Sequence, residues 1–376
     1  MAPPLRNLKM LDLSRQLPGP FCSMMLADLG VDVLVVASPA DVLGIGIPLI
    51  QRNKRSMTLN LKAPEGKRIF DRLTAEADII LEGFRPGVTE RLGIDYASMA
   101  KLNARLVYCS ISGYGQDGPY RDKVGHDINY LGYAGVLGLS GRTDQPPVVM
   151  PVQVADIGGG ALMATVGILA ALLARERTGR GQFVDISMLD GSLAWNVFHT
   201  LLYLVSGRQQ PERGRTRLTG HHACYAVYET KDGKYVSVGA LEEHFWRNLC
   251  NALGVPEFIP DQFVEGPRGE AMFRVIGEKF RAKTQAEWLQ ELGPIDICFG
   301  PVNTIGEALA DAQLQARGMV RDVEGLTLIA SPLKFSDTPA REPTKPPEFG
   351  QHTDDVLCRL GYQAADIERL RADKIV

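Results

Sequence analysis

Short apolar segments alternate with longer, helix-like segments through the first half of the chain, and this alternation constrains the fold more than any other feature. Each apolar segment has the length of a strand, and Val31–Val36 is apolar enough to be buried on both faces. Strands that alternate with helices of this length indicate parallel pairing with right-handed crossovers, and therefore an α/β fold. The expected strands are Lys9–Ser14, Val31–Val36, Met57–Leu61, Asp78–Phe84, Leu106–Gly113 and Gln182–Ser187.

The pattern changes after about residue 205, and a chain of 376 residues is long enough for two cores. The sequence predicts a large domain over residues 1–205 and an exposed, arginine-rich linker over 206–224. A smaller α+β domain is expected over 225–325, where Tyr225–Thr230 and Lys234–Val238 flank a hairpin turn. The segment 326–376 is expected to return to the large domain.

Composition argues against several classes of protein. A formal net charge of −3 gives no global basic field, so a nucleic-acid partner is not expected. The six cysteines lack zinc-binding spacing, which predicts reduced thiols and no metal site. The longest apolar stretch, Ala161–Ala174, is shorter than a bilayer span and predicts a buried helix. Because the N-terminus also lacks the apolar run of a secretion signal, we expect a cytoplasmic protein without a membrane span.

The candidates for chemistry are acidic residues and histidines. Neither a glycine-rich nucleotide loop nor a serine-hydrolase elbow occurs, which leaves acid–base or carboxylate chemistry. Asp156 precedes Gly158-Gly159-Gly160 and an apolar helix, so it is either a helix N-cap or part of an anion site that a ligand approaches closely. His126 alone is more often structural, and the adjacent Asp127 is either its partner or another cap. Glu242 either fixes the tautomer of an imidazole or is solvated.

Two further groups stand out. The pair His221-His222 is unusual, but no third metal ligand is evident near it, so a metal is not expected there. Basic residues gather where strands are expected to end, at Lys54, Arg55, Lys62, Arg85 and Arg91. Because ligands of open α/β sheets bind at the carboxyl ends of strands, this distribution fits a phosphate-rich ligand, and scattered surface charge explains it equally well.

Six ordered blocks, which together span nearly the whole chain, resemble the class III CoA-transferase family. They are Leu17–Cys22, Lys54–Lys62, Glu82–Val88, Ser112–Pro119, Gly181–Gly191 and Gly350–Leu357. Three shorter segments are similar to motifs of the α-methylacyl-CoA racemase branch: Gly125–Tyr130, Ala155–Gly160 and Val238–Glu242. The resemblance implies a Rossmann-like large domain, a small domain, and two interlocked copies with the active site between large and small domains.

The resemblance also implies roles for individual residues. His126 and Asp156 would transfer protons at the α-carbon of an acyl-CoA thioester, and Asp127 and Glu242 would tune His126. No cofactor would be required, since coenzyme A is part of the substrate. The residues expected to contact CoA are Gln16, Leu17, Pro18, Leu59, Asn60, Leu61, Lys62, Gly83, Phe84, Val88, Arg91, Gly125, Asn129 and Tyr130.

Three activities remain open at this point. The first is racemisation of 2-methylacyl-CoA through an enolate, with the backbone N–H groups at Gly158–Gly160 stabilising the enolate oxygen. The second is transfer of CoA between carboxylic acids, with Asp156 as a nucleophile. The third is CoA binding without turnover. The segment Val35–Pro39 and the pair His221-His222 depart from the family pattern, in the CoA contact and the acyl pocket respectively.

Overall fold

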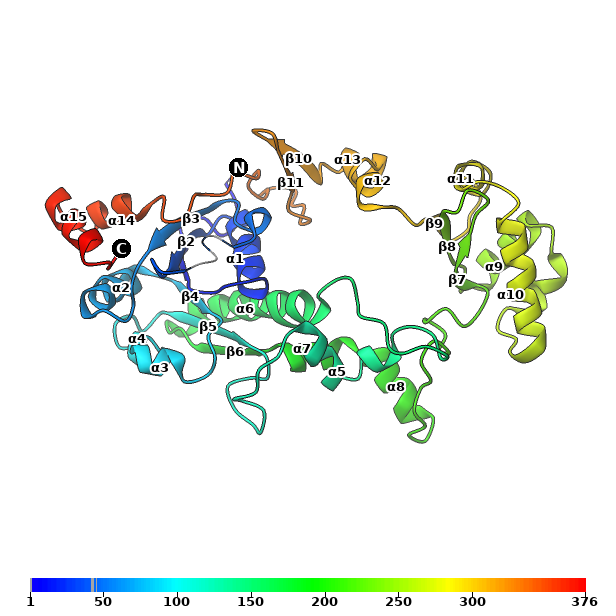
Figure 1. Cartoon of the computed structure of the whole chain (residues 1–376), viewed down its shortest axis with the longest axis horizontal. Coiled ribbons are helices and arrows are strands. Elements are labelled where there is room, and N and C mark those ends of the chain that lie inside the picture. The colour runs from blue at the N-terminus through cyan, green and yellow to red at the C-terminus, as the bar shows by residue number, and fades with distance from the viewer. Residues whose placement is uncertain (1, 42–43, 45) are drawn as a thin grey trace. The chain divides into compact units, whose positions relative to one another are not determined.

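The computed structural model describes residues 2–41, 44 and 46–376, which form two compact units. The first unit comprises residues 1–134, 151–196 and 312–376, and the second comprises 135–150 and 197–311. The second unit thus begins at Val197 rather than after residue 205, and it also takes in the segment 135–150, which we had expected in the large domain. Figure 1 shows the elements of both units along the chain.

A six-stranded parallel sheet forms the centre of the first unit, as the alternating pattern predicted (Figure 1). Its strand order is β3-β2-β1-β4-β5-β6, so the chain reverses direction across the sheet between β1 and β4. In doubly wound sheets of this order, ligands bind at that switch point. The strands are β1 (Lys9–Asp12), β2 (Asp32–Ala37), β3 (Lys54–Thr58), β4 (Ile79–Glu82), β5 (Val107–Ser112) and β6 (Phe183–Ser187).

Helices cover both faces of this sheet because its strands carry apolar side chains on both. On one face, Leu11, Leu34 and Ile80 join a core with α2 and the C-terminal helices. On the other face, α1 and α6 pack against the sheet. The helices are α1 (Pro18–Asp28), α2 (Pro64–Glu76), α3 (Val88–Leu92), α4 (Tyr96–Met99), α5 (Asp127–Tyr133), α6 (Met163–Thr178), α7 (Met188–Trp195), α13 (Ala312–Ala316), α14 (Thr353–Arg359) and α15 (Ala364–Ala372), with the 3₁₀ turn η1 (Pro48–Ile50).

The helix that carries Asp156 differs from the expectation. A π-helix, η3 (Val154–Leu162), runs directly into α6, so the continuous helix is longer than the apolar stretch in the sequence suggested. Among the described residues, Val154–Thr178 is the one run long and apolar enough to cross a membrane, with a mean hydropathy of 2.1. Half of that window is buried within the protein, as in core helices of soluble folds.

The C-terminal segment belongs to the first unit. The backbone N–H of His352 donates to the Ser56 carbonyl (2.8 Å), and that of Asn60 donates to the Ile375 carbonyl (2.7 Å). The hairpin β10 (Val320–Val323) and β11 (Leu326–Ile329) spans the boundary expected between residues 325 and 326. The domain boundary therefore cannot lie there, because it would cut a paired hairpin.

The second unit is a small α+β structure around a three-stranded antiparallel sheet, β7-β8-β9. The predicted hairpin is present as β7 (Tyr225–Glu229) and β8 (Tyr235–Gly239). Trp246 is fully buried in its core and donates to the Phe258 carbonyl (3.0 Å). Its other elements are β9 (Phe299–Pro301), η2 (Leu137–Leu139), α8 (Val197–Val205), α9 (Glu243–Ala252), η4 (Pro256–Asp261), α10 (Gly266–Phe280), α11 (Gln285–Leu292) and α12 (Ile305–Leu309).

Candidate active site

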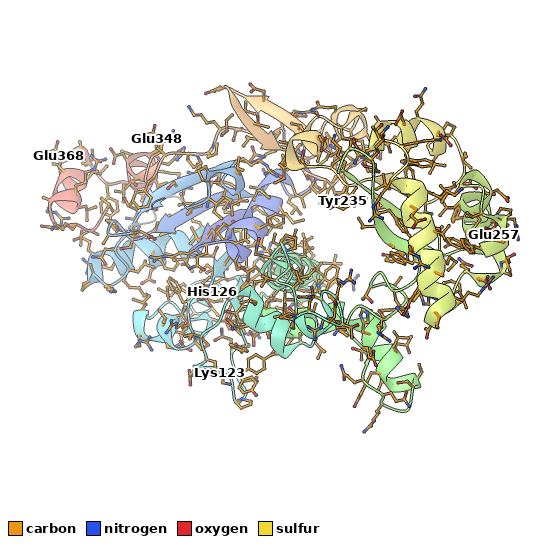
Figure 2. The ribbon with its side chains drawn as sticks, turned by 45° about the vertical axis from the view of Figure 1, so that its right-hand side comes forward. Lys123, His126, Tyr235, Glu257, Glu348 and Glu368 are labelled. Atoms are coloured by element: carbon orange, nitrogen blue, oxygen red, sulfur yellow. The ribbon has the colours of Figure 1, made fainter. Side chains whose placement is uncertain are left out.

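His126 lies at the start of α5, where the chain enters the helix from an extended conformation. Its backbone N–H donates to the side-chain oxygen of Asn129 (3.0 Å), so Asn129 closes the first turn of the helix. The His126 side chain is exposed. Figure 2 shows His126 and Lys123 on the same segment, which leads into α5. The imidazole is therefore held by a rigid helix start and remains accessible to a ligand.

Asp127 connects His126 to Asp156. Its carboxylate oxygen accepts hydrogen bonds from the backbone N–H groups of Ala155 (2.7 Å) and Asp156 (3.0 Å). Of the two roles expected for Asp127, the structure gives it the capping one, but for η3 rather than for its own helix. The contact fixes η3 against α5 and brings Asp156 into the neighbourhood of His126.

Asp156 is not the N-cap residue that its position suggested. The cap position is occupied by Gln153, and Asp156 lies within the first turn of η3, half-buried. Burial and, next, the negative charge of Asp127 raise the pKa of Asp156 to about 6, with His126 acting in the opposite direction. A carboxyl group with a pKa in this range can exchange protons near neutral pH, which a solvated aspartate does poorly.

The glycines after Asp156 serve packing rather than ligand approach. A Cβ on Gly159 would lie 2.7 Å from the Met188 carbonyl oxygen, and one on Gly160 would lie 3.0 Å from Met188 Cγ. These glycines allow α7 to pack directly on η3. The N–H groups of Gly158–Gly160 lie inside the π-helix, and these glycines are buried, so this arrangement does not favour them as donors to an enolate oxygen.

Tyr130 shapes the loop that carries His126. Its hydroxyl donates to the Gly125 carbonyl (2.6 Å), and its ring packs edge-on against Tyr114. A Cβ on Gly125 would lie 2.8 Å from Tyr130 and 2.9 Å from the Tyr114 hydroxyl. Burial, with the charge of Asp156 next, raises the pKa of Tyr130 to about 12, so the phenol stays neutral. Tyr130 and Gly125 thus support the loop, and their expected contact with CoA stays a prediction.

Two adjoining cavities lie beside the carboxyl ends of β1 and β2, and they share part of their lining. The first, about 360 Å³, is lined by the expected ligand contacts Gln16 and Leu17. The second, about 330 Å³, is lined by five more of them, namely Leu59, Asn60, Leu61, Lys62 and Phe84. The other expected contacts, Pro18, Gly83, Val88, Arg91, Gly125, Asn129 and Tyr130, line neither cavity.

Two of the basic residues expected to attract phosphate are structural instead. Lys54 lies inside β3, fully buried, and donates to the Pro20 carbonyl (2.9 Å) and to Gln51 (3.0 Å). Burial lowers its pKa to about 8, although the Asp12 carboxylate at 3.8 Å counteracts this. Arg55, in the same strand, pairs with Asp32 (2.8 Å).

The remaining three, Lys62, Arg85 and Arg91, are exposed, and within the described part of the chain they enter no ion pair. Sequence inspection missed Arg121, which lies near Arg91 across Gly87. It also missed Glu82, at the carboxyl end of β4, which accepts from the Phe84 N–H (2.7 Å) and positions that wall of the second cavity. Burial raises the pKa of Glu82 to about 7. Glu82 lies in the block Glu82–Val88, and Arg121 follows the block Ser112–Pro119. Only their tertiary contacts place the two side chains near the expected ligand-binding residues.

Glu242 lies in the second unit, exposed, at the N-cap of α9. It is thus on a different unit from His126, and its support of that imidazole stays a prediction. The segment Val35–Pro39, noted as a departure from the family pattern, contributes Val35, Val36 and Ala37 to the first cavity. That wall is apolar and supplies no cationic contact.

The chain is similar to known proteins in sequence and in fold. Residues 5–353 match CoA-transferase family III. The chain is 37% identical to α-methylacyl-CoA racemase of Mus musculus over 99% of its own length and 97% of the relative's. It is 32% identical to succinate–glutarate CoA-transferase of Agrobacterium fabrum, over 95% and 96% of the two chains. A CaiB/BaiF family protein of Brucella suis superimposes with a TM-score of 0.83 at 30% identity, covering 96% of this chain and 100% of that one. The chain therefore belongs to CoA-transferase family III.

Proposed function

We propose that this protein racemises 2-methylacyl-CoA thioesters by removing and returning the α-proton. The observation that carries the proposal is the group formed by His126, Asp127 and Asp156. The Asp156 carboxyl has a pKa of about 6, and the Asp127 carboxylate, next to His126 in the chain, accepts hydrogen bonds from the start of the helix that carries Asp156. The Asp156 carboxyl can change protonation state near neutral pH, as a two-base racemase requires of its acidic partner. The racemase among the relatives supports the same activity.

The reaction requires His126 and Asp156 to begin in opposite protonation states. With one epimer, neutral His126 takes the α-proton while protonated Asp156 delivers its proton to the opposite face of the planar enolate. The products are imidazolium and carboxylate, which is the starting state for the other epimer. Asp127 supports this exchange, because its charge adds to burial in keeping the pKa of Asp156 above its ordinary value. Glu242 would act on His126 by hydrogen bonding.

The two cavities would hold the CoA portion of the substrate. Their linings are largely apolar, which suits the pantetheine arm, and Lys62 lines the second cavity. Lys62, Arg85 and Arg91 would bind the phosphates, since among the described residues they have no competing ion pair. This chemistry needs no metal or other cofactor, and the activity assays of this subsection are set up without either.

CoA transfer is the second candidate, and the relatives favour it specifically. A succinate–glutarate CoA-transferase and a succinyl-CoA:glutarate CoA-transferase are 32% and 31% identical to this chain. In that reaction the Asp156 carboxylate would attack the thioester carbonyl and expel CoA as thiolate, leaving an acyl anhydride on the enzyme. The pKa of Asp156 favours the racemase, because a nucleophilic carboxylate gains nothing from being held partly protonated.

One experiment separates the candidates. The protein is incubated with a 2-methylacyl-CoA in deuterium oxide, with and without a free carboxylic acid as acceptor. Deuterium at the α-carbon without exchange of CoA supports the racemase. Acceptor-dependent exchange, with an anhydride trapped by hydroxylamine, supports the transferase. Binding with neither outcome means CoA binding without turnover, and the proposal is then wrong.

The His126→Ala variant tests the assignment of the two protons. We expect it to abolish α-proton exchange from one epimer more strongly than from the other, because each epimer loses its proton to a different group. Positioned acid–base groups are worth about 10²- to 10⁴-fold. The matched control is His244→Ala, an exposed histidine of α9. Equal exchange from both epimers, at the rate of the unaltered protein, would contradict the assignment.

A second copy of the chain would cover α8. This helix has no buried residue, and Val197, Leu201, Leu204 and Val205 are all more than half exposed. Exposed apolar side chains on one helix indicate a protein contact. Size-exclusion chromatography with light scattering should give the mass of a dimer, and Leu201→Glu should give that of a monomer. A monomeric unaltered protein would exclude the interlocked homodimer.

A further inference from the structure

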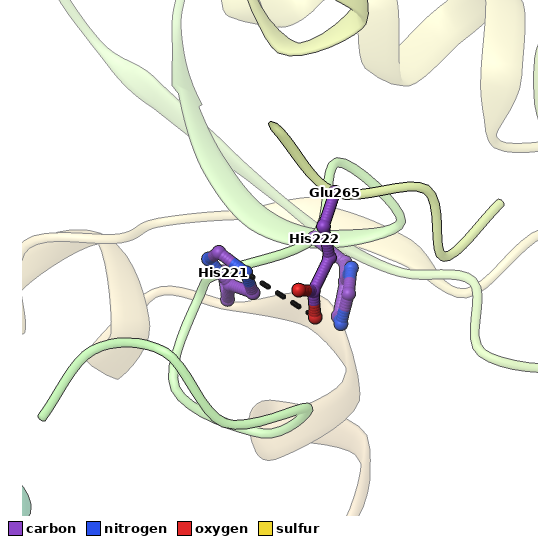
Figure 3. Close-up of side chains that lie close together, drawn as sticks. All are labelled: His221, His222 and Glu265. Atoms are coloured by element: carbon purple, nitrogen blue, oxygen red, sulfur yellow. Dashed lines mark ion pairs between the residues drawn. The ribbon is translucent and has the colours of Figure 1, made fainter. Parts of the chain in front are cut away.

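Two histidines and a glutamate converge in the second unit. His221 and His222 lie in the loop that precedes β7, and Glu265 is the residue before α10. One potential ligand atom from each of the three lies within 4.8 Å of the others. His221 Nε2 is 3.7 Å from a Glu265 carboxylate oxygen, and the dashed line in Figure 3 marks this pair. The sequence alone gave no third metal ligand near the two histidines, because Glu265 is 43 residues from His222 along the chain.

The two imidazoles have few other partners. In the described part of the chain, no side-chain hydrogen bond to either ring occurs; each packs against the other, with ring centroids 4.8 Å apart. His222 is buried and also meets Phe263 edge-on. Neither ring nitrogen of His222 is among the fully buried polar atoms that lack a hydrogen-bond partner in the described residues, so both nitrogens remain open to a ligand.

We propose that His221, His222 and Glu265 bind one divalent transition-metal ion, with Zn²⁺ as the fitting species. Two imidazoles and one carboxylate are a donor set that zinc accepts, and three protein ligands leave a fourth tetrahedral position open. Ligand atoms about 2.0–2.2 Å from a shared ion must come closer together than they are here. The side chains of His221 and Glu265, 24% and 69% exposed, have the freedom to make this adjustment.

The metal would act on the wall of a cavity. Leu218, Thr219 and Gly220 immediately precede the histidines and line a cavity of about 670 Å³ in the second unit, with strands β7 and β8. An ion bound to His221, His222 and Glu265 would tie this loop to the start of α10. Metal binding would therefore hold one side of that cavity in place and stabilise the second unit against unfolding.

Arg217 limits the affinity of this site. Its guanidinium group lies over the Phe263 ring at 4.1 Å, and His222 contacts the same ring. The positive charge is thus close to the position of the ion and repels it. Arg217→Gln should bind metal more tightly than the unaltered protein, which is a change that a purely structural role of the histidines does not predict.

The test is titration of the full-length, metal-free protein with Zn²⁺ by calorimetry and with Co²⁺ by visible absorption. We expect one equivalent to bind, with the intense d–d bands of four-coordinate cobalt. His221→Ala, His222→Ala and Glu265→Gln should each weaken binding more than about tenfold, since even second-shell changes cost about 10–100-fold. His244→Ala and Glu257→Gln, exposed residues of the same unit, are matched controls and should bind as the unaltered protein does.

Three outcomes overturn the proposal: absence of saturable binding, an affinity that the three variants leave unchanged, or an equal loss of affinity in the two controls. His222 is buried, and its replacement can disturb folding. In that case His221→Ala and Glu265→Gln decide the matter, because both side chains are more exposed and circular dichroism can verify that the variants are folded.

Discussion

Replacing Asp156 by asparagine should remove activity and at the same time stabilise the protein at neutral pH. The pKa of this carboxyl is about 6, above its ordinary value of 3.8, because burial and Asp127 disfavour the charged form. The folded state therefore holds the proton more tightly than the unfolded state does. By linkage, the free energy of unfolding falls as pH rises from about 4 to about 6, and above that range the full cost of the charge is present.

The size of this effect follows from the shift. About two pKa units at ~1.4 kcal/mol each set a ceiling of ~3 kcal/mol, and partial solvation of Asp156 reduces it to ~1–2 kcal/mol. The amide has nearly the same shape and carries no charge. We thus expect Asp156→Asn to raise the free energy of unfolding by ~1–2 kcal/mol at pH 7.5, and by much less at pH 4.5.

Urea unfolding followed by circular dichroism at both pH values measures the difference. Asp117→Asn is the control: Asp117 is exposed and, within the described residues, its side chain makes no hydrogen bond. That variant should change stability little at either pH. If Asp156→Asn were destabilised at pH 7.5, or stabilised equally at both pH values, then the carboxyl would not be strained by its surroundings and the reasoning would be refuted.

Three other changes test the structure around the site. Asp127→Asn keeps an oxygen that accepts from the start of η3 but removes a negative charge, so the pKa of Asp156 should fall and the acidic limb of the pH–rate profile should move to lower pH. Gly159→Ala should lower the free energy of unfolding by ~1–3 kcal/mol, because the methyl group meets the backbone of α7. Arg52→Ala should cost ~3–5 kcal/mol, since it leaves Asp28, a buried partner at 2.7 Å, without its ion pair.

The glycine and arginine variants have matched controls, and Asp127→Asn has a result that would contradict it. Gly132→Ala, in α5, meets no atom within 4 Å and should be tolerated. Arg321→Ala removes an exposed pair with Glu342 and should cost less than about 1 kcal/mol. Denaturant unfolding midpoints measure the stability of the glycine and arginine variants, and a variant as stable as its control would contradict the prediction for that contact. An unchanged acidic limb of the pH–rate profile for Asp127→Asn would contradict the effect of Asp127 on Asp156.

The sheet could be predicted from the sequence because its strands are buried on both faces. Runs such as Val31–Val36 must then be apolar, and the helices between them must be long enough to cross over, so pattern alone gives the parallel arrangement. The prediction was wrong at the start of β3, which begins at Lys54 rather than Met57. Lys54 is buried, and its tertiary contacts with the Pro20 carbonyl, Gln51 and Asp12 make that position tolerable.

The sequence also named His126 and Asp156 as candidate reactive groups, through the motifs around them, and their catalytic roles stay a prediction. It did not give the surroundings that set their chemistry. The sequence left Asp127 as a partner or a cap; the structure makes it a cap of a helix 27 residues away in the numbering, and this long-range contact helps set the pKa of Asp156. Likewise, the glycines after Asp156 suggested room for a ligand, whereas they accommodate α7.

The sequence by itself determined which segments are apolar, which residues carry ionisable groups, and to which family the ordered motifs point. Only the tertiary structure decided which charges are buried, which backbone groups are capped, and that Glu265 meets His221 and His222. The physical reason is that composition and periodicity are local properties of the chain. A pKa, a packing clash or a ligand set depends on atoms brought together from distant positions.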